Sequence, residues 1–132
     1  MTTEQAVARP PILISETEAE SLADLAVSVA ARHPVASRLL LEELDRAEVV
    51  PAVPDDVVTM GSTVEFVVAG TGERRQVELV FPGDADIAEG RISILTPMGA
   101  GLIGLRVGQT ISWPDLSGHE RLLTIESVSR PR

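Results

Sequence analysis

The sequence predicts an α+β fold in which a short antiparallel helical hairpin precedes a small antiparallel β domain with one short helix. Three observations support this prediction. Apolar residues recur at helical spacing between residues 15 and 50, and β-rich segments separated by turn residues fill residues 57–128. An apolar, glycine-rich segment at residues 96–105 interrupts the β-rich half. We therefore expect a flexible tail at residues 1–10, the hairpin at 11–50 and the β domain at 51–132.

A short extended piece is expected at residues 12–14, and the first helix is predicted to begin after it at the motif S-E-T-E, residues 15–18. In this capping box, Ser15 accepts a hydrogen bond from the backbone three residues on, and Glu18 reaches back to the N–H of Ser15. The helix should end near Arg32, because Pro34 disfavours the helical conformation at His33. Its apolar stripe consists of Ala19, Leu22, Leu25, Ala26, Val29 and Ala30.

The second helix is predicted to begin at Pro34, which suits the first helical turn, and to end before Pro51. A turn of two or three residues forces the two helices to fold back on each other. About 15 residues in each helix give a hairpin roughly 20–25 Å long. Two arrangements are open: a projecting, closely packed helical pair, or an ordinary hairpin that lies on the sheet. The second stripe consists of Ala36, Leu40, Leu44 and Ala47.

About five strands are expected after Pro51, at residues 63–69, 75–81, 91–95, 109–113 and 121–128. Pro97 should end the third of these strands, since proline cannot donate to a ladder. Residues 98–105 then allow two helical turns that pack on the sheet. Gly99 and Gly101 would permit close packing, and Gly104 would end the helix. The apolar side chains expected to face the sheet are Leu102, Ile103 and Leu105.

Composition excludes several functions. The net charge of −9 disfavours nucleic-acid binding, and so does the low aromatic content of three residues in 132. The acidic surface is therefore expected either to be simply solvated or to dock a basic partner. There is no cysteine, and no apolar run approaches the length of a membrane span. The early glutamate in the N-terminal segment argues against a signal peptide, so we expect a cytoplasmic protein.

Three kinds of catalytic or ligand site also find no support. Residues 96–105 lack the Gly-Lys-Ser/Thr of a phosphate-binding loop. Prolyl isomerisation needs a pocket lined by several aromatic side chains, and Phe66, Phe81 and Trp113 are too few. His33 and His119 are expected in exposed turns rather than beside a nucleophile. The sequence therefore predicts no catalytic residue, no metal site and no cofactor.

The segment E-G-R-I-S-I-L-T-P-M-G-A-G-L-I-G-L-R-V-G-Q-T-I, residues 89–111, resembles the signature of the Gre-type transcription elongation factors. The segments E-E-L-D-R-A-E-V-V (42–50) and D-V-V-T-M-G-S-T-V-E-F (56–66) resemble a short subfamily of these factors, named for the regulation of nucleoside diphosphate kinase. The resemblance extends over about residues 11–130. It implies an N-terminal antiparallel coiled coil and a C-terminal domain similar to FK506-binding proteins.

The resemblance also implies a protein partner, bacterial RNA polymerase, with no direct sequence-specific nucleic-acid contact and no membrane. In Gre factors the C-terminal domain docks at the rim of the polymerase secondary channel, partly through a Ser-Pro motif, and the coiled coil enters the channel. That motif corresponds here to Thr96 and Pro97, with Met98 and Gly99 beside them. Threonine replaces serine, so the hydroxyl is retained.

The hairpin tip distinguishes this chain from a cleavage-stimulating Gre factor. Such a factor places two acidic side chains at its tip to help hold a Mg²⁺ ion, which needs carboxylate oxygens. Residues 29–38 carry Arg32, His33, Pro34 and Arg38 and no acid. We expect a regulator that competes with Gre factors without RNA cleavage. The acids further along the second helix are expected on a solvated face near the base of the hairpin, which makes a metal site there a weaker interpretation; they are Glu42, Glu43, Asp45 and Glu48. Two alternative functions stay open: cleavage with acids from an unexpected place, and an interaction module that regulates nucleoside diphosphate kinase.

Overall fold

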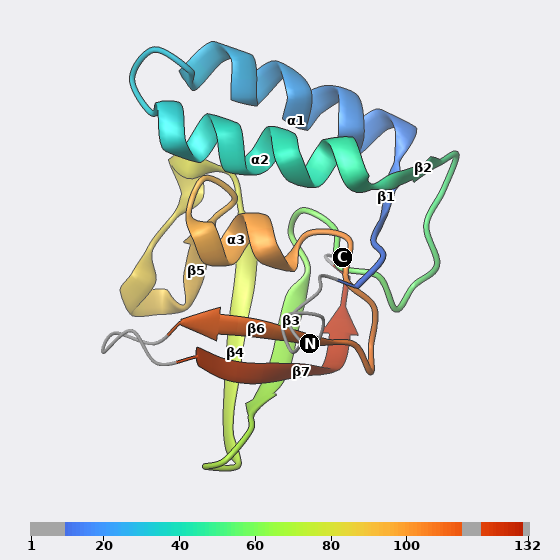
Figure 1. Cartoon of the computed structure of the whole chain (residues 1–132), viewed down its shortest axis with the longest axis vertical. Coiled ribbons are helices and arrows are strands. Elements are labelled where there is room, and N and C mark those ends of the chain that lie inside the picture. Colours follow the sequence, from blue (N-terminus) through green and yellow to red (C-terminus); the bar gives the residue numbers. More distant parts are fainter. Residues whose placement is uncertain (1–9, 115–119, 131–132) are drawn as a thin grey trace, which may run out of the picture.

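A computed structural model describes residues 10–114 and 120–130 and shows an α+β fold in layers. Helices α1 (Glu16–Val29) and α2 (Pro34–Arg46) form an antiparallel hairpin. They lie side by side over the short helix α3 (Pro97–Leu102), and α3 separates them from a five-stranded sheet (Figure 1). The helical N-terminal region followed by a sheet domain confirms the predicted fold class. The boundary near residue 51, the coiled coil and the likeness to FK506-binding proteins stay predictions.

The predicted capping box of α1 is confirmed for Ser15 but not for Glu18. The Ser15 hydroxyl accepts a hydrogen bond from the backbone N–H of Glu18 at 3.2 Å, as predicted. The Glu18 carboxylate does not return to the Ser15 N–H. Its Oε2 atom instead accepts from the backbone N–H of Met60 at 3.1 Å, in the segment that leads into the sheet. The side chain thereby joins the hairpin to the rest of the molecule.

The hairpin begins and ends on a two-stranded parallel sheet that combines β1 (Leu13–Ser15) with β2 (Glu48–Val50). The expected extended piece before α1 is therefore present, whereas β2 was predicted to be part of the second helix. Helix α2 ends at Arg46, and the backbone N–H of Glu48 donates to the carbonyl of Ile12 at 3.0 Å. This pairing fixes both ends of the hairpin at its base.

The large sheet has the order β5-β4-β3-β7-β6. Four of its strands pair antiparallel, but β4 and β5 pair parallel, so the prediction of an antiparallel sheet is wrong at this edge. The reason is the connection between β4 and β5, which reverses twice through two short 3₁₀ turns, Pro82–Asp84 and Ile87–Glu89. The strands are β3 (Thr63–Val68), β4 (Glu73–Val80), β5 (Arg91–Ser93), β6 (Thr110–Pro114) and β7 (Glu120–Ser129).

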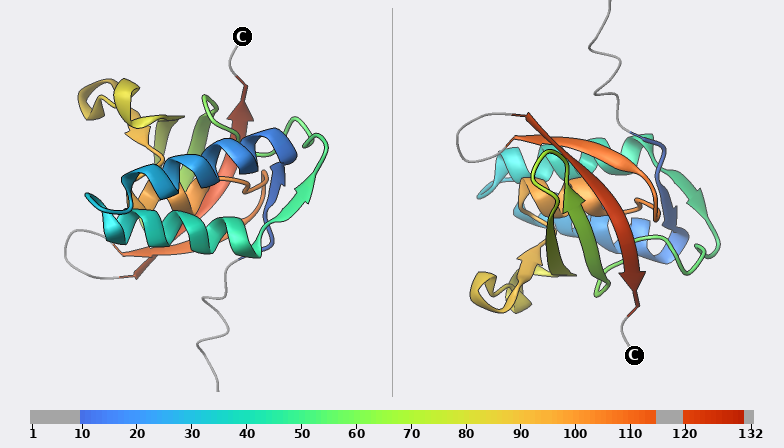
Figure 2. Two further views of the ribbon diagram at one scale, coloured as in Figure 1. Left: turned by 90° about the horizontal axis from the view of Figure 1, so that it is seen from above. Right: turned by 90° about the horizontal axis from the view of Figure 1, so that it is seen from below.

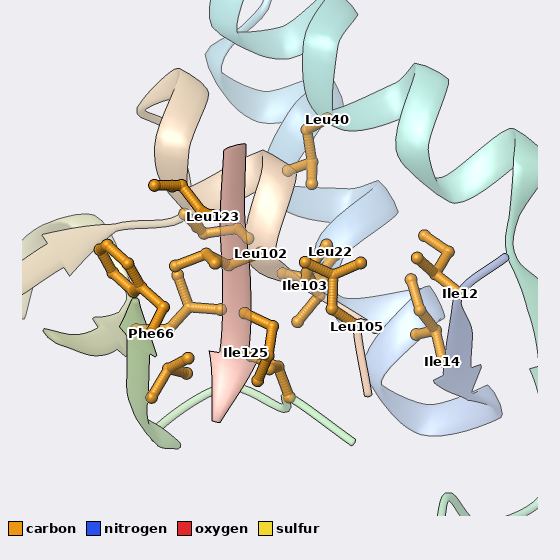
Figure 3. Close-up of a cluster of buried hydrophobic side chains, with 14 of the residues drawn as sticks. Ile12, Ile14, Leu22, Leu40, Phe66, Leu102, Ile103, Leu105, Leu123 and Ile125 are labelled. Atoms are coloured by element: carbon orange, nitrogen blue, oxygen red, sulfur yellow. The ribbon is translucent and has the colours of Figure 1, made fainter. Parts of the chain in front are cut away.

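One continuous apolar core extends from the hairpin to the sheet (Figure 3). Each large aliphatic side chain that it removes from water contributes roughly 1.5–3 kcal/mol. The predicted helix residues 102, 103 and 105 are all buried there, together with residues from both hairpin helices. The hairpin therefore lies on the domain, through α3, and is not a projecting pair. The labelled members of the core are Ile12, Ile14, Leu22, Leu40, Phe66, Leu102, Ile103, Leu105, Leu123 and Ile125.

Backbone hydrogen bonds strengthen this docking. The N–H of Leu13 donates to the carbonyl of Gly104 at 3.1 Å, and the N–H of Gly104 donates to the carbonyl of Val58 at 3.0 Å. Gly104 has φ +81° and follows the end of α3, as predicted for a helix-terminating glycine. The segment after α3 thus pairs with both the N-terminal strand and the approach to β3. Within the described residues, no helix has the length and apolar character needed to cross a bilayer.

Candidate functional site

The predicted rim residues lie together at the start of α3. Thr96 is the N-cap, and its hydroxyl accepts from the backbone N–H of Gly99 at 3.0 Å. The same hydroxyl donates to the carbonyl of Ser93 at 2.7 Å. Pro97 occupies the first helical position, where its lack of an N–H costs nothing. The Thr96 hydroxyl is therefore already used in both directions within the chain.

The four predicted rim residues differ in how far they are available to a partner. Pro97 is exposed, Thr96 and Met98 are half-buried, and Gly99 is buried. Met98 also packs against the apolar core. The surface that this segment offers is consequently centred on the ring of Pro97, while its neighbours hold the helix in place.

Gly99 is required by a close backbone approach. A Cβ atom at this position would lie 2.1 Å from the carbonyl oxygen of Ser93 and 2.9 Å from the Cα of Ile94. Both atoms belong to the backbone, which cannot move aside as a side chain can. The predicted role of Gly99 in close packing is confirmed. Gly101 is half-buried, and its part in this packing stays a prediction.

The predicted tip residues also lie together, at the turn between α1 and α2. Arg32, His33, Pro34 and Arg38 are all exposed. The helix ends at Val29, three residues earlier than expected, since the backbone N–H groups of Arg32 and His33 both turn back to the Val29 carbonyl at 3.1 and 2.7 Å. The buried Ser37 hydroxyl donates to the Ala26 carbonyl at 2.8 Å and links the two helices close to this turn.

Two exposed apolar residues at the tip were not predicted as part of the site. Val27 is 70% exposed in the last turn of α1, and Val35 is 57% exposed in the first turn of α2. Neither residue belongs to the predicted apolar stripes. An apolar residue outside the stripe of its helix is expected to be exposed, and this signal in the sequence could have identified both. The tip therefore combines two aliphatic side chains with the positive charges of Arg32 and Arg38.

The acidic residues of α2 lie on the base side of the tip and are not all solvated. Arg38 pairs with Glu42 through an Nε–Oε2 distance of 3.9 Å, between two exposed side chains. Glu43, expected on the solvated face, is instead buried and accepts from Arg46 Nε at 2.9 Å. Arg46 also donates from Nη1 to the Pro10 carbonyl at 2.6 Å. Glu43 is therefore a structural anchor for the base of the hairpin.

Glu18 is the one group whose pKa clearly departs from its ordinary value within the described part of the chain. Burial raises the pKa of its carboxyl, although the hydrogen bond from the Met60 N–H and the positive charge of Arg130 act to lower it. The described ranges contain no cluster of three or more potential metal-ligating side chains. His33 is the N-cap of α2 and exposed, as expected, while His119 lies outside the described residues.

Comparison with known protein families gives a definite assignment for both parts of the chain. Residues 53–130 match the family model described as Transcription elongation factor, GreA/GreB, C-term, which covers more than half of the chain. The chain therefore belongs to the GreA/GreB family of transcription elongation factors. Residues 10–50 match the model described as Rnk N-terminus, so within this family the chain is Rnk-like.

Individual relatives agree with this assignment. The Regulator of nucleoside diphosphate kinase of Escherichia coli (strain K12) is 40% identical over 110 residues, which are 81% of this chain and 80% of the relative. The Transcription inhibitor protein Gfh1 of Thermus aquaticus is 39% identical over 75 residues, which are 55% of this chain and 48% of the relative. A solved GreA/GreB elongation factor from Nitrosomonas europaea is 39% identical with a TM-score of 0.75, and the match covers 89% of this chain and 98% of that structure.

Proposed function

We propose that this protein is a non-catalytic regulator that binds bacterial RNA polymerase at the rim of the secondary channel. It competes there with Gre-type factors and does not stimulate RNA cleavage. Membership of the GreA/GreB family supports the choice of partner. The name of one relative, a transcription inhibitor protein, supports an inhibitory rather than a stimulating role. The proposal assigns the protein to the bacterial cytoplasm, where the polymerase acts.

The acid-free hairpin tip is the observation that carries this proposal. Residues 25–41 contain Arg32 and Arg38 but no aspartate or glutamate. A Mg²⁺ ion needs carboxylate oxygens around it, and a positively charged surface repels it. The tip therefore has the wrong charge to bring a catalytic metal ion to the polymerase active site.

The docked hairpin supports the same conclusion through its reach. Helix α1 has 14 residues, which corresponds to about 21 Å. One face of the hairpin is buried against α3, where Leu22, Ala26 and Leu40 join the common core. Extension of the tip away from the domain would expose these side chains to water. This favours a protein that covers the entrance of a channel over one that inserts deeply into it.

The rim contact is assigned to the start of α3, with Pro97 as the exposed residue. Thr96 and Gly99 support it by holding the helix in place, because the Thr96 hydroxyl caps the helix and Gly99 permits the close packing. A variant at Thr96 should therefore act mainly through stability, whereas a variant at Pro97 should act mainly through binding.

A competition experiment tests this proposal. Labelled Gre factor is bound to core RNA polymerase, and its displacement by the parent protein or by Pro97→Asp is measured. Aspartate is well tolerated in the first turn of a helix, so Pro97→Asp should fold normally. Pro51→Asp, at another exposed proline, is the matched control. We expect displacement by the parent and by Pro51→Asp, and at least roughly tenfold weaker displacement by Pro97→Asp, which corresponds to about 1.4 kcal/mol.

Cleavage is tested separately on a backtracked transcription complex. The parent protein should release no short 3′ RNA fragments, and it should suppress the fragments that an added Gre factor produces. Fragment release by the parent protein alone would overturn the proposal. Failure to displace the Gre factor at any concentration would overturn the choice of binding site.

Regulation of nucleoside diphosphate kinase by direct contact is the second candidate, favoured by the name of the 40%-identical relative. It predicts a complex between the two purified proteins in the absence of polymerase. Analytical ultracentrifugation of the mixture distinguishes the candidates, since control through transcription predicts no such complex.

A further inference from the structure

The connection between β4 and β5 forms an ordered lobe, residues 81–91, that projects from the body of the molecule in both views of Figure 2. Backbone hydrogen bonds close it on itself. The N–H of Asp86 donates to the carbonyl of Arg91 at 2.9 Å, and the N–H of Arg91 donates to the carbonyl of Asp86 at 2.9 Å. Gly90, with φ +77°, makes the second reversal. The lobe is thus an ordered loop that is closed by its own backbone hydrogen bonds.

The lobe presents large apolar side chains to solvent. Ile87 is 84% exposed, which is the highest value among the large hydrophobic residues of the described chain, and Phe81 is 40% exposed. Phe81 is also one of only three aromatic residues in the whole sequence. Aliphatic and aromatic side chains held outward on an ordered loop are typical of protein interaction surfaces.

The charge around these apolar residues is predominantly negative. Asp84, Asp86 and Glu89 are exposed, and no ion pair involves them within the described part of the chain. The cation of the lobe itself, Arg91, pairs with Glu78 through an Nε–Oε1 distance of 3.8 Å. Asp84 and Asp86 line a hollow of about 420 Å³ together with Glu78 and Arg91, so three carboxylates and one guanidinium surround it. The surface therefore has apolar contacts, a polar recess and uncompensated negative charge.

Electrostatics selects the class of partner. The phosphate backbone of a nucleic acid and the anionic headgroups of a membrane are both repelled by these carboxylates. A second copy that presents the same lobe is repelled as well. A positively charged protein segment is attracted, and its apolar side chains can cover Ile87 and Phe81. An amphipathic helix with lysine or arginine along one face supplies both features at once.

We propose that the 81–91 lobe is a docking surface for a basic amphipathic helix of a protein partner. Ile87 and Phe81 contact the apolar face of that helix, and a lysine or arginine enters the hollow beside Asp84 and Asp86. This surface is separate in sequence from the tip and from the start of α3, and its test uses no polymerase. It can therefore hold whether or not the proposed function does.

The test uses a synthetic helical peptide of about 18 residues, built from leucine on one face and lysine on the other. Binding to the ¹⁵N-labelled full-length protein is followed by amide chemical shifts and by titration at two salt concentrations. We expect shifts concentrated in residues 81–91, no binding of a leucine and glutamate peptide, and weaker binding at high salt.

Paired variants separate a built surface from general attraction to an acidic protein. Ile87→Ser should weaken peptide binding roughly tenfold, because an aliphatic contact with the peptide is lost, whereas Val107→Ser, at an exposed valine in the turn before β6, should change it less than about twofold. The double variant Asp84→Asn with Asp86→Asn should weaken binding more than Glu20→Gln with Asp24→Asn, which removes the same charge from α1.

Three results would overturn the proposal. Shifts spread evenly over the acidic surface, or equal effects of the two double variants, would mean that the peptide senses only net charge. An Ile87→Ser variant that binds the peptide like the parent would remove the apolar contact. Lobe shifts that depend on protein concentration without any peptide would assign the surface to a second copy. Urea unfolding of each variant checks that the fold is retained.

Discussion

Replacement of Gly99 by alanine should destabilise the protein strongly, although alanine is the better helix former. The new Cβ would lie 2.1 Å from the Ser93 carbonyl oxygen, where ordinary contact begins at 3.4 Å, so α3 must move by about 1.3 Å. Such a movement disturbs Leu102, which is fully buried, and the cap at Thr96. Overpacking costs about 1–3 kcal/mol and a lost cap about 1 kcal/mol, while alanine recovers about 0.5–1 kcal/mol.

The net expectation is a loss of about 1–3.5 kcal/mol in the free energy of unfolding, or roughly 4–13 °C in Tm for a chain of this size. Urea unfolding followed by far-UV circular dichroism measures it. Gly83→Ala is the matched control, because Gly83 has ordinary φ and a Cβ added there would meet no atom within 4 Å. This control should change stability by less than about 0.5 kcal/mol. Equal stability of the two variants would refute the close approach of α3 to β5.

Three further perturbations follow from the contacts described above. Gly104→Ala should cost at least about 2 kcal/mol by urea unfolding, since positive φ and contact with the N-terminal strand both oppose a side chain, whereas Gly108→Ala, with positive φ but open space, should cost about 1 kcal/mol. Glu18 has a raised pKa when folded, so its stabilising contribution is present at low pH and is lost as pH rises through that pKa. Glu18→Gln still offers an acceptor to Met60 and cannot ionise, so its stability relative to the parent should increase from about pH 4 to pH 7; a constant difference would contradict this. Ser37→Ala should cost about 1 kcal/mol by the same measurement, because a buried hydrogen bond to a carbonyl of α1 is lost; an unchanged urea midpoint would argue against that bond.

Local sequence signals predicted the elements well, because each depends on neighbours along the chain. Pro34 begins α2, as its fixed φ favours. Gly104 follows α3 in the left-handed conformation, and the five strands of the sheet occur where β-rich runs alternate with turns. The apolar residues after Pro97 were likewise correctly assigned to the core. The predicted helix was too long, however, because α3 ends at Leu102, and Ile103 and Leu105 are buried from the segment that follows it.

Features that depend on contacts between residues distant in sequence could not be predicted from these local signals. A hairpin that projects and one that lies on α3 need similar apolar stripes, and they are distinguished only by the burial of Leu22 and Leu40 in one common core with Leu102. The parallel pairing of β4 and β5 depends on two reversals of the chain within one connection. The sequence of that connection predicts only an ordinary loop. Glu18 satisfied the capping-box pattern, yet a backbone N–H distant in sequence competed for its carboxylate.

The sequence predicted the types of residue in the candidate site, but it did not predict how their atoms are arranged. The charge of the tip is a property of residue types, so the grouping of Arg32 with Arg38 followed directly from the hairpin. The two hydrogen bonds of the Thr96 hydroxyl depend on where Ser93 lies, and the motif alone does not contain that information. The exposure of Ile87 was hidden for a related reason, since an isoleucine inside a loop gives no periodic signal.

The small parallel sheet of β1 and β2 has a consequence for how the hairpin can vary in length. It ties the entry to α1 and the exit from α2 at one end, and leaves the turn at the other end untethered by strand pairing. Whole helical turns can therefore be inserted in matched pairs at that turn while the anchored end keeps its register. The length of the hairpin can thus change while its base stays fixed, and added helical turns would carry the turn between α1 and α2 beyond the part of the domain that the hairpin now covers.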